Sequence, residues 1–165
     1  MKTRSRIYQI IRLAIITALY VTLTIVLSFI SYGDIQFRIA EILILLCFFR
    51  KDYGIALVLG CAIANFFSPL GIVDVIFGTL ATVFSVLCVM KAKNLLIASI
   101  YPVVFNGIII GLELFYVLDL PFFLSMISVV IGEAVVVMVL GNLIFFKLKK
   151  NAGFLELIEA NQNCK

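Results

Sequence analysis

Four carboxylates and one arginine interrupt the long apolar stretches of this chain or lie at their edges: Arg38, Glu41, Asp74, Glu113 and Glu133. A charged side chain at the centre of a bilayer costs about 2.5–3.5 kcal/mol on insertion scales, and less near the interface. If the stretches span a membrane, these charges carry a combined penalty on the order of 5–15 kcal/mol unless they pair, become protonated or bind a ligand. They are therefore the first candidates for function.

The spacing of the charges separates one possible pair from three acids without a partner. Arg38 and Glu41 are three residues apart and can pair on one face of a helix. Such a pair either holds a short helix in place or contacts a ligand. Asp74, Glu113 and Glu133 have no evident basic partner, so protonation, water or a cationic, donor-rich ligand must satisfy them.

Two asparagines, Asn65 and Asn106, lie in the same apolar segments. Each is a candidate ligand contact, but an amide can equally join two helices by a hydrogen bond in lipid. Asp74 also has a second interpretation, because a carboxylate at the start of a helix is favoured by the helix dipole.

The composition indicates that these residues lie in an integral membrane protein. The 165 residues are 64% hydrophobic, and the mean hydropathy is +1.24. Six spans of about 20 residues need roughly 120 residues, which leaves no room for a soluble catalytic domain. The net charge of +4 comes from clusters beside the apolar stretches and indicates orientation rather than nucleic-acid binding.

Several kinds of chemistry have no motif in the sequence. There is no histidine, no GxxxxGK[ST] phosphate loop, no HExxH and no GxSxG. The chain is therefore expected to be no enzyme, to have no ATPase of its own and to hold no cofactor or metal. Cys47, Cys61, Cys88 and Cys164 lack CxxC spacing, which predicts free thiols.

The apolar runs and the turn residues between them predict an all-α bundle of six transmembrane helices, with the second and third short. The expected helices cover residues 8–32, 36–50, 53–68, 71–90, 94–117 and 121–147. Residues 1–150 then form a single six-helix transmembrane domain, and residues 151–165 form a short cytoplasmic tail, at most a surface helix.

Basic residues occur only at alternate breaks between these helices, apart from Arg38. They lie in the N-terminal segment, at Arg50 and Lys51, at Lys91 and Lys93, and in the C-terminal segment. The positive-inside rule places all four in the cytoplasm, and Gly33, Asp34, residues 68–71 and Asp119 outside. The polar residues of helices two to six then converge on the outer half of the bundle, which predicts a ligand pocket that opens outward in a multi-pass cell-membrane protein.

Small residues recur at the spacing used where helices pack closely in lipid. Ala14 and Ala18 form such a stripe on the first helix, and Ala56, Gly60 and Ala64 form another on the third. Packing within the chain is the preferred interpretation of the second stripe. For the first, internal packing and docking of a partner both remain open.

Three segments carry a resemblance to a known family. The stretches IQFRIAE at 35–41, LGCAIANFFS at 59–68 and DVIFGTLAT at 74–82 resemble the QueT family, and the likeness extends over about residues 7–147. These proteins are substrate-binding S components of energy-coupling factor (ECF) transporters, linked to queuosine precursors.

The resemblance implies that the chain binds a 7-deazaguanine, such as queuine or 7-aminomethyl-7-deazaguanine, at the extracellular side. It also implies that a transmembrane T component and two cytoplasmic ATPases, which use ATP, drive uptake, with the Ala14/Ala18 stripe docking on the T component. One carboxylate can accept the adjacent N–H donors of a guanine-like edge, a second can balance a protonated amine, and an amide can contact the ring carbonyl. The acids Asp74, Glu113 and Glu133 are not assigned to these tasks individually.

Two alternatives remain. The chain is an S component for another vitamin, because the same fold serves unrelated substrates, or an autonomous ion- or proton-coupled carrier in which Glu113 and Glu133 titrate. An intramembrane enzyme is disfavoured because no nucleophile and base are evident.

Overall fold

The computed structural model describes residues 2–31 and 36–160, with side chains described from Arg6 onward in the first helix. All regular elements in these ranges are helical. In chain order they are α1 (Lys2–Val26), α2 (Ser28–Ser31), the 3₁₀ helix η1 (Ile39–Leu45), α3 (Leu46–Phe49), α4 (Tyr53–Asn65), α5 (Ile72–Val89), α6 (Leu95–Leu118), α7 (Phe122–Glu133), the π-helix η2 (Ala134–Gly141), α8 (Asn142–Leu148) and α9 (Ala152–Leu157).

The chain is a multi-pass helical membrane protein, as the sequence predicts. Four helices are long and apolar enough to cross a membrane: Arg6–Val26, Ile72–Val89, Leu95–Leu118 and Phe122–Leu148. Ile39–Phe49 and Tyr53–Asn65 are shorter apolar helices, in the places expected for the short second and third helices. The predicted break at Tyr32-Gly33-Asp34 lies outside the described residues.

The predicted helix over residues 36–50 differs most from the structure. Residues 36–38 are not helical, Ile39–Leu45 form η1, and only Leu46–Phe49 form an α-helix. A 3₁₀ helix rises about 2.0 Å per residue, whereas an α-helix rises about 1.5 Å. The short segment therefore extends farther through the bundle than an α-helix of the same length.

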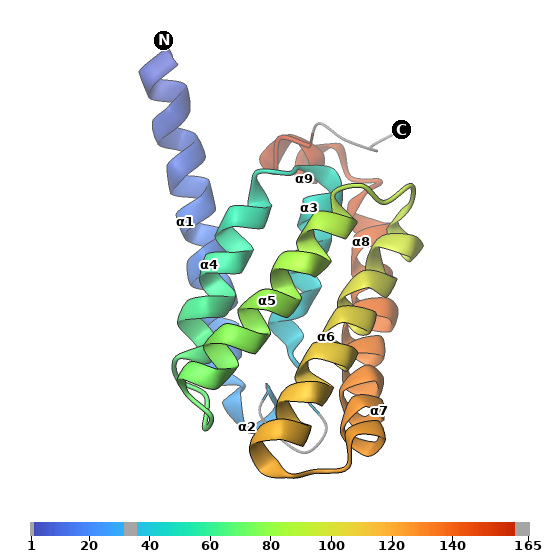
Figure 1. Cartoon of the computed structure of the whole chain (residues 1–165). Helices are drawn as coiled ribbons and strands as arrows, with labels where there is room; N and C mark the ends of the chain where they lie inside the picture. The colour runs from blue at the N-terminus through green and yellow to red at the C-terminus, as the bar shows by residue number, and fades with distance from the viewer. Residues whose placement is uncertain (1, 32–35, 161–165) are drawn as a thin grey trace.

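This segment forms the centre of the bundle. Ile44, Leu45, Cys47 and Phe49 are fully buried, and η1 contacts α1, α4, α5, α6 and η2. Figure 1 shows α3 and the chain before it behind α4 and α5, with α1 at one side of the bundle and α7 at the other. The acids carried by η1 and by the end of α7 are thus directed to the interior.

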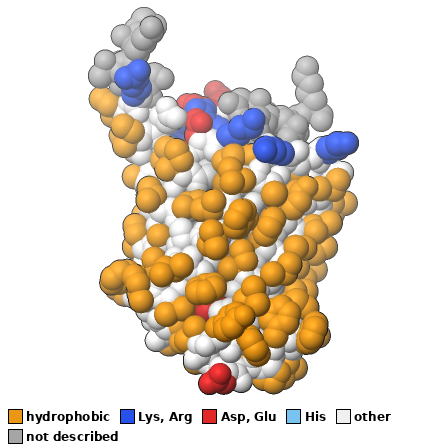
Figure 2. Space-filling view, in the orientation of Figure 1, with side chains coloured by type: hydrophobic (Ala, Val, Ile, Leu, Met, Phe, Trp, Pro, Cys, Tyr) orange, Lys and Arg blue, Asp and Glu red, His pale blue; other side chains and the backbone are white. Residues whose placement is uncertain are grey.

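The surface has the charge distribution expected for a membrane protein. Figure 2 shows a broad belt of hydrophobic side chains, with Lys and Arg side chains gathered at the end where Figure 1 places both chain termini. The positive-inside rule assigns this end to the cytoplasm. The same rule predicts that the opposite end, where α5 and α7 begin and α6 ends, faces outward, and on this basis we call the two ends the cytoplasmic end and the outer end.

A polar cap at the cytoplasmic end holds the C-terminal segment against the bundle. Arg12 and Arg50 both pair with Glu159, and Arg50 Nη1 lies 2.5 Å from Glu159 Oε2. The hydrogen bond from Arg12 lowers the pKa of Glu159. Tyr53 donates a 3.0 Å hydrogen bond to the carbonyl of buried Ile158.

The small residues of α4 pack within the chain, which confirms the preferred interpretation of that stripe. Thr17 of α1 donates a 2.9 Å hydrogen bond to the carbonyl of Ala56. A Cβ atom on Gly60 would lie 3.0 Å from Cβ of Tyr20. The lack of a side chain at Gly60 therefore leaves room for Tyr20 to pack against α4. Ala14 and Ala18, in contrast, are exposed on α1.

The cysteines follow the expectation of free thiols as far as they are described. Cys47, Cys61 and Cys88 are free, and Cys164 lies outside the described residues.

Candidate substrate-binding site

Arg38 and Asp74 form a buried ion pair between the start of η1 and the first turn of α5. Arg38 Nη2 lies 3.6 Å from Asp74 Oδ1. Helical spacing predicted that Arg38 pairs with Glu41, but the backbone at Arg38 has φ −79° and ψ 82°, outside the helical region, and the side chain reaches Asp74. The inference that Asp74 has no basic partner is therefore wrong.

Asp74 is further fixed by the turn before α5. Ser68 Oγ donates a hydrogen bond to Asp74 Oδ2. Asn65 Nδ2 donates to the backbone carbonyl of Asp74 at 3.1 Å and to Cys61 Sγ at 3.2 Å. Asn65 thus joins α4 to α5, which is the hydrogen-bonding role that its sequence context left open.

Glu41 lies at the centre of the bundle and connects several elements. Its Oε1 accepts a 2.5 Å hydrogen bond from the Tyr20 hydroxyl of α1. Its other oxygen has no hydrogen-bond partner among the described residues, and neither has either amide atom of Asn106. Glu41 is close enough to Asn106 and Arg38 to interact with both.

Glu113 and Glu133, like Glu41, carry carboxylate oxygens without a hydrogen-bond partner among the described residues. Within the part of the chain that the structure describes, both oxygens of Glu113 and Oε2 of Glu133 lack a hydrogen-bond partner. Glu113 interacts electrostatically with Asp74, and Glu133 with Glu41 and Arg38. Buried polar atoms are normally hydrogen-bonded, so such atoms mark places where a ligand or water can bind.

The structure thus brings together all of the binding residues predicted from the sequence. Each has 3% exposure or less, and each lies within interaction range of another member: Arg38, Glu41, Asn65, Asp74, Asn106, Glu113 and Glu133. We call these residues the acid cluster. It carries four carboxylates and one arginine, so it is suited to a ligand that brings positive charge or several N–H donors.

A pocket of about 630 Å³ adjoins the acid cluster at the outer end of the bundle. Its volume is in the range of small-molecule sites. The wall is mostly apolar and is formed by Gln36, Ser68, Pro69, Leu70, Asp74, Leu114, Leu118, Leu120, Pro121, Leu124, Ser125, Ile127, Ser128 and Ile131.

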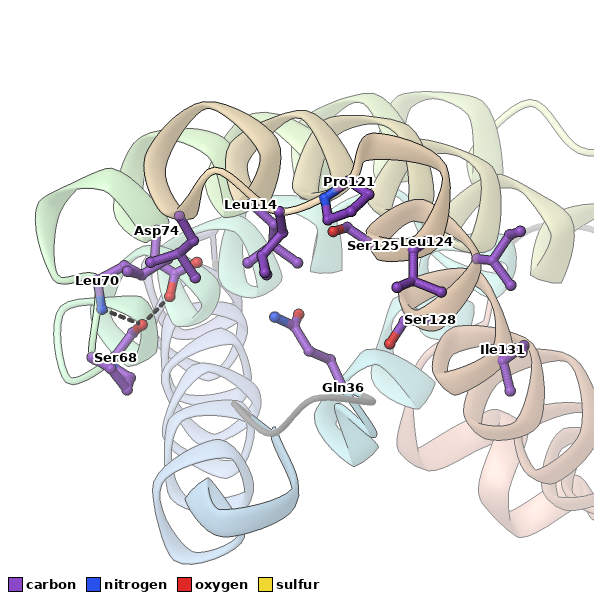
Figure 3. Close-up of a pocket in the computed structure, with 14 residues that line it drawn as sticks. Gln36, Ser68, Leu70, Asp74, Leu114, Pro121, Leu124, Ser125, Ser128 and Ile131 are labelled. Atoms are coloured by element: carbon purple, nitrogen blue, oxygen red, sulfur yellow. Dashed lines mark hydrogen bonds between the residues drawn. The ribbon is translucent and has the colours of Figure 1, made fainter.

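Asp74 links the pocket to the acid cluster, because it belongs to both. Figure 3 shows Asp74 and its bond to Ser68 on one side of the pocket, Ser125 and Ser128 on the side formed by α7, and Gln36 between them. The six other predicted residues are buried and are not in the pocket wall.

Sequence reasoning missed Gln36, Ser125 and Ser128 as polar residues of the wall. Two features of the sequence could have indicated them. Gln36 lies in the first of the three segments that resemble the family, and the two serines are three residues apart and so share one helix face. Gly132 positions Gln36: a Cβ atom there would lie 2.2 Å from the Gln36 carbonyl oxygen, so only a glycine permits this approach.

Metal binding has no support in the part of the chain that is described, where no three His, Cys, Asp or Glu side chains are grouped to hold an ion. The site is therefore built from carboxylates, amides, hydroxyls and one guanidinium.

A helical membrane protein with an acid-rich site at the end opposite its basic surface is suited to capture a polar small molecule. The chain belongs to the QueT transporter family, whose model matches residues 10–150. This confirms the family suggested by the three sequence segments.

A relative in this family is the Queuosine precursor transporter QueT of Lactococcus lactis subsp. cremoris (strain MG1363). The two sequences are 40% identical over 146 residues, which cover 79% of this chain and 86% of the relative. No solved structure matches the chain.

Proposed function

We propose that this chain is the substrate-binding S component of an ECF-type importer and captures a queuosine precursor at the extracellular side. The preferred substrates are queuine and 7-aminomethyl-7-deazaguanine. The observation that carries the proposal is the acid cluster behind an outward pocket, in a chain 40% identical to a queuosine precursor transporter.

The chemistry of the cluster supports a ligand of this kind. A guanine-like edge presents adjacent N–H donors that one carboxylate accepts in a bidentate manner, and a protonated amine requires a second acid. Asp74 already pairs with Arg38. Glu113 and Glu133 have unpartnered oxygens among the described residues, so we assign the ligand donors chiefly to them.

Glu113 interacts with Asp74, which lines the pocket, and this supports a route of the ligand from the pocket to the cluster. A ligand in the pocket meets Asp74 first and reaches Glu113 when the Asp74 side chain moves. The apolar wall formed by Leu114, Leu118 and Leu124 then packs against the faces of the purine-like ring.

The sequence has no phosphate loop, so in our proposal ATP is hydrolysed by other subunits. In this assembly a T component and two cytoplasmic ATPases drive uptake, and the T component docks on α1 at Ala14 and Ala18. The exposure of α1 supports this: 11% of its most apolar window is buried, against 50% for α6.

The alternative, an autonomous proton- or ion-coupled carrier, is favoured by one observation, the unpartnered buried acids Glu113 and Glu133. Vesicle uptake separates the two functions. We expect accumulation of labelled 7-aminomethyl-7-deazaguanine only when the T component, the ATPases and ATP are present, with no effect of an uncoupler. Accumulation by this chain alone that collapses with an uncoupler would establish the carrier and refute the S component.

The same vesicles test the docking face. Ala14→Leu with Ala18→Leu should abolish copurification of the T component and ATP-driven uptake while substrate binding is retained. Val26→Leu, which enlarges a side chain that is 67% exposed on the same helix, is the matched control. Loss of binding in the double variant would contradict the docking assignment.

A further inference from the structure

Tyr20 connects the acid cluster to α1, and none of the roles assigned above uses it. The side chain is 1% exposed, and its hydroxyl donates a 2.5 Å hydrogen bond to Glu41 Oε1. The other oxygen of Glu41 has no hydrogen-bond partner among the described residues. The bond from Tyr20 is therefore an important part of what holds this carboxylate in place.

The attachment differs in kind from other polar contacts of α1. Gln9 and Arg12 reach Asp52 and Glu159 in the cytoplasmic cap, and Thr17 donates to a backbone carbonyl of α4. Tyr20 instead reaches a carboxylate of the candidate binding site. A ligand that moves the Glu41 carboxylate can thus change the position of α1 through Tyr20.

Glu41 also lies where the bundle departs from α-helical geometry. It belongs to the 3₁₀ helix η1, which packs against the π-helix η2. Glu133, the residue before η2, interacts electrostatically with Glu41. A π-helical segment inside an α-helix, such as η2 between α7 and α8, frequently marks a functional site.

We propose that Tyr20 is the coupling residue through which ligand binding in the acid cluster changes the position of α1. A cationic ligand that draws Glu133 or Glu41 toward itself changes the hydrogen bond between Tyr20 and Glu41. Because Tyr20 belongs to α1, the position of α1 changes with it. Tyr20 acts through Glu41 and is a positioning residue, not a ligand contact. The inference rests on the proposed function, because it takes the ligand and the docking role of α1 from it.

The chain offers a closely matched control. Tyr53 is also 1% exposed, and its hydroxyl donates a 3.0 Å hydrogen bond to the Ile158 carbonyl at the cytoplasmic end. Tyr20→Phe and Tyr53→Phe each remove one buried hydroxyl and leave the ring. Only the first removes a contact with the acid cluster, so a general loss of packing or of hydrogen bonding affects both variants alike.

The experiment measures the distance between α1 and α6 in the full chain, reconstituted in nanodiscs. Spin labels are placed at Ile10→Cys on α1 and Leu96→Cys on α6, which are 65% and 55% exposed, after Cys88 and Cys164 are changed to serine. The distance distribution is recorded with and without 7-aminomethyl-7-deazaguanine. Affinity for the T component with its ATPases is measured in parallel.

We expect the ligand to shift the distance distribution and to change partner affinity by about fivefold or more in the wild type and in Tyr53→Phe, within the usual range of coupling between sites. In Tyr20→Phe the shift should vanish and partner affinity should change less than about twofold, while ligand affinity stays within about threefold of wild type. This combination separates coupling from binding.

Each other result decides against the proposal. A shift in Tyr20→Phe equal to that in Tyr53→Phe overturns the coupling role and leaves the proposed function intact. A loss of ligand affinity in Tyr20→Phe well beyond threefold makes Tyr20 part of the binding site instead. No binding of either 7-aminomethyl-7-deazaguanine or queuine to the wild type overturns the proposed substrate and, with it, this inference.

Discussion

Glu113 and Glu133 carry most of the proposed binding chemistry. Both are fully enclosed, with carboxylate oxygens that lack hydrogen-bond partners among the described residues. Burial of an unpartnered carboxylate is costly, and a ligand that supplies N–H donors or positive charge removes that cost. The acids are thus prepared for a ligand at the expense of stability in its absence.

Removing the charge of either carboxylate should therefore weaken ligand binding. Glu113→Gln and Glu133→Gln should each weaken binding of 7-aminomethyl-7-deazaguanine about tenfold or more, because a hydrogen bond to a charged group contributes about 1.5–3 kcal/mol. Titration calorimetry of the purified chain measures the effect. Glu156→Gln on the exposed face of α9 should leave affinity unchanged, and unchanged affinity in both cluster variants would place the site elsewhere.

At the scale of residues, sequence reasoning identified the charged members of the site and missed some neutral ones. A charge in an apolar segment is conspicuous because of its insertion cost. Ser125 and Ser128 carry no such cost and resemble ordinary helix residues. The Arg38–Asp74 pair could not be predicted because it depends on the non-helical backbone at Arg38.

At the scale of elements, two departures from the α-helix lie at the centre of the molecule. η1 follows Arg38 and contains Glu41, and η2 begins directly after Glu133. A segment that is apolar on all sides has no clear hydrophobic periodicity. The sequence therefore predicted a helix in both places, and a helical segment is present in both. It did not indicate that η1 is a 3₁₀ helix or that η2 is a π-helix.

Close approach of α7 to the segment before η1 leads to a further prediction. Gly132→Ala places a methyl group 2.2 Å from the Gln36 carbonyl oxygen. Because the backbone must shift, we expect a loss of about 1–3 kcal/mol of unfolding free energy. Affinity should fall as well, since Gln36 lines the pocket.

Denaturation of the purified chain in detergent, together with ligand titration, measures both effects of Gly132→Ala. Val135→Ala, which shortens a side chain that is 40% exposed nearby, is the control and should change stability much less. Wild-type stability in Gly132→Ala would show that α7 and the Gln36 segment are not held as closely as the structure has them.

At the scale of the whole molecule, charge segregation predicted the arrangement best. Basic residues gather at one end, together with both chain termini, and an apolar belt covers the face that Figure 2 shows. The sequence carries this information because the distribution of Lys and Arg determines how the helices are oriented when they insert into the membrane. The sequence predicted a pocket that opens outward, but not its lining, because the wall combines the turn before α5, the end of α6 and one face of α7.

The same scale shows that α1 is the most exposed of the long helices, with 11% of its window enclosed. One of its faces packs on α4 and η1. The rest of the bundle packs around η1 and α3. In the proposed function, the exposed face of α1 is the surface that the T component contacts.

The most direct test of the account is the binding of queuosine precursors to the purified wild-type chain, without any partner. Titration calorimetry should show saturable one-to-one binding of 7-aminomethyl-7-deazaguanine or queuine. Guanine should bind more weakly because it lacks the protonated amine of the 7-substituent, whose positive charge the excess carboxylates balance. Riboflavin and thiamine should not bind. Tight binding of a vitamin with no binding of either deazaguanine would contradict the central claim.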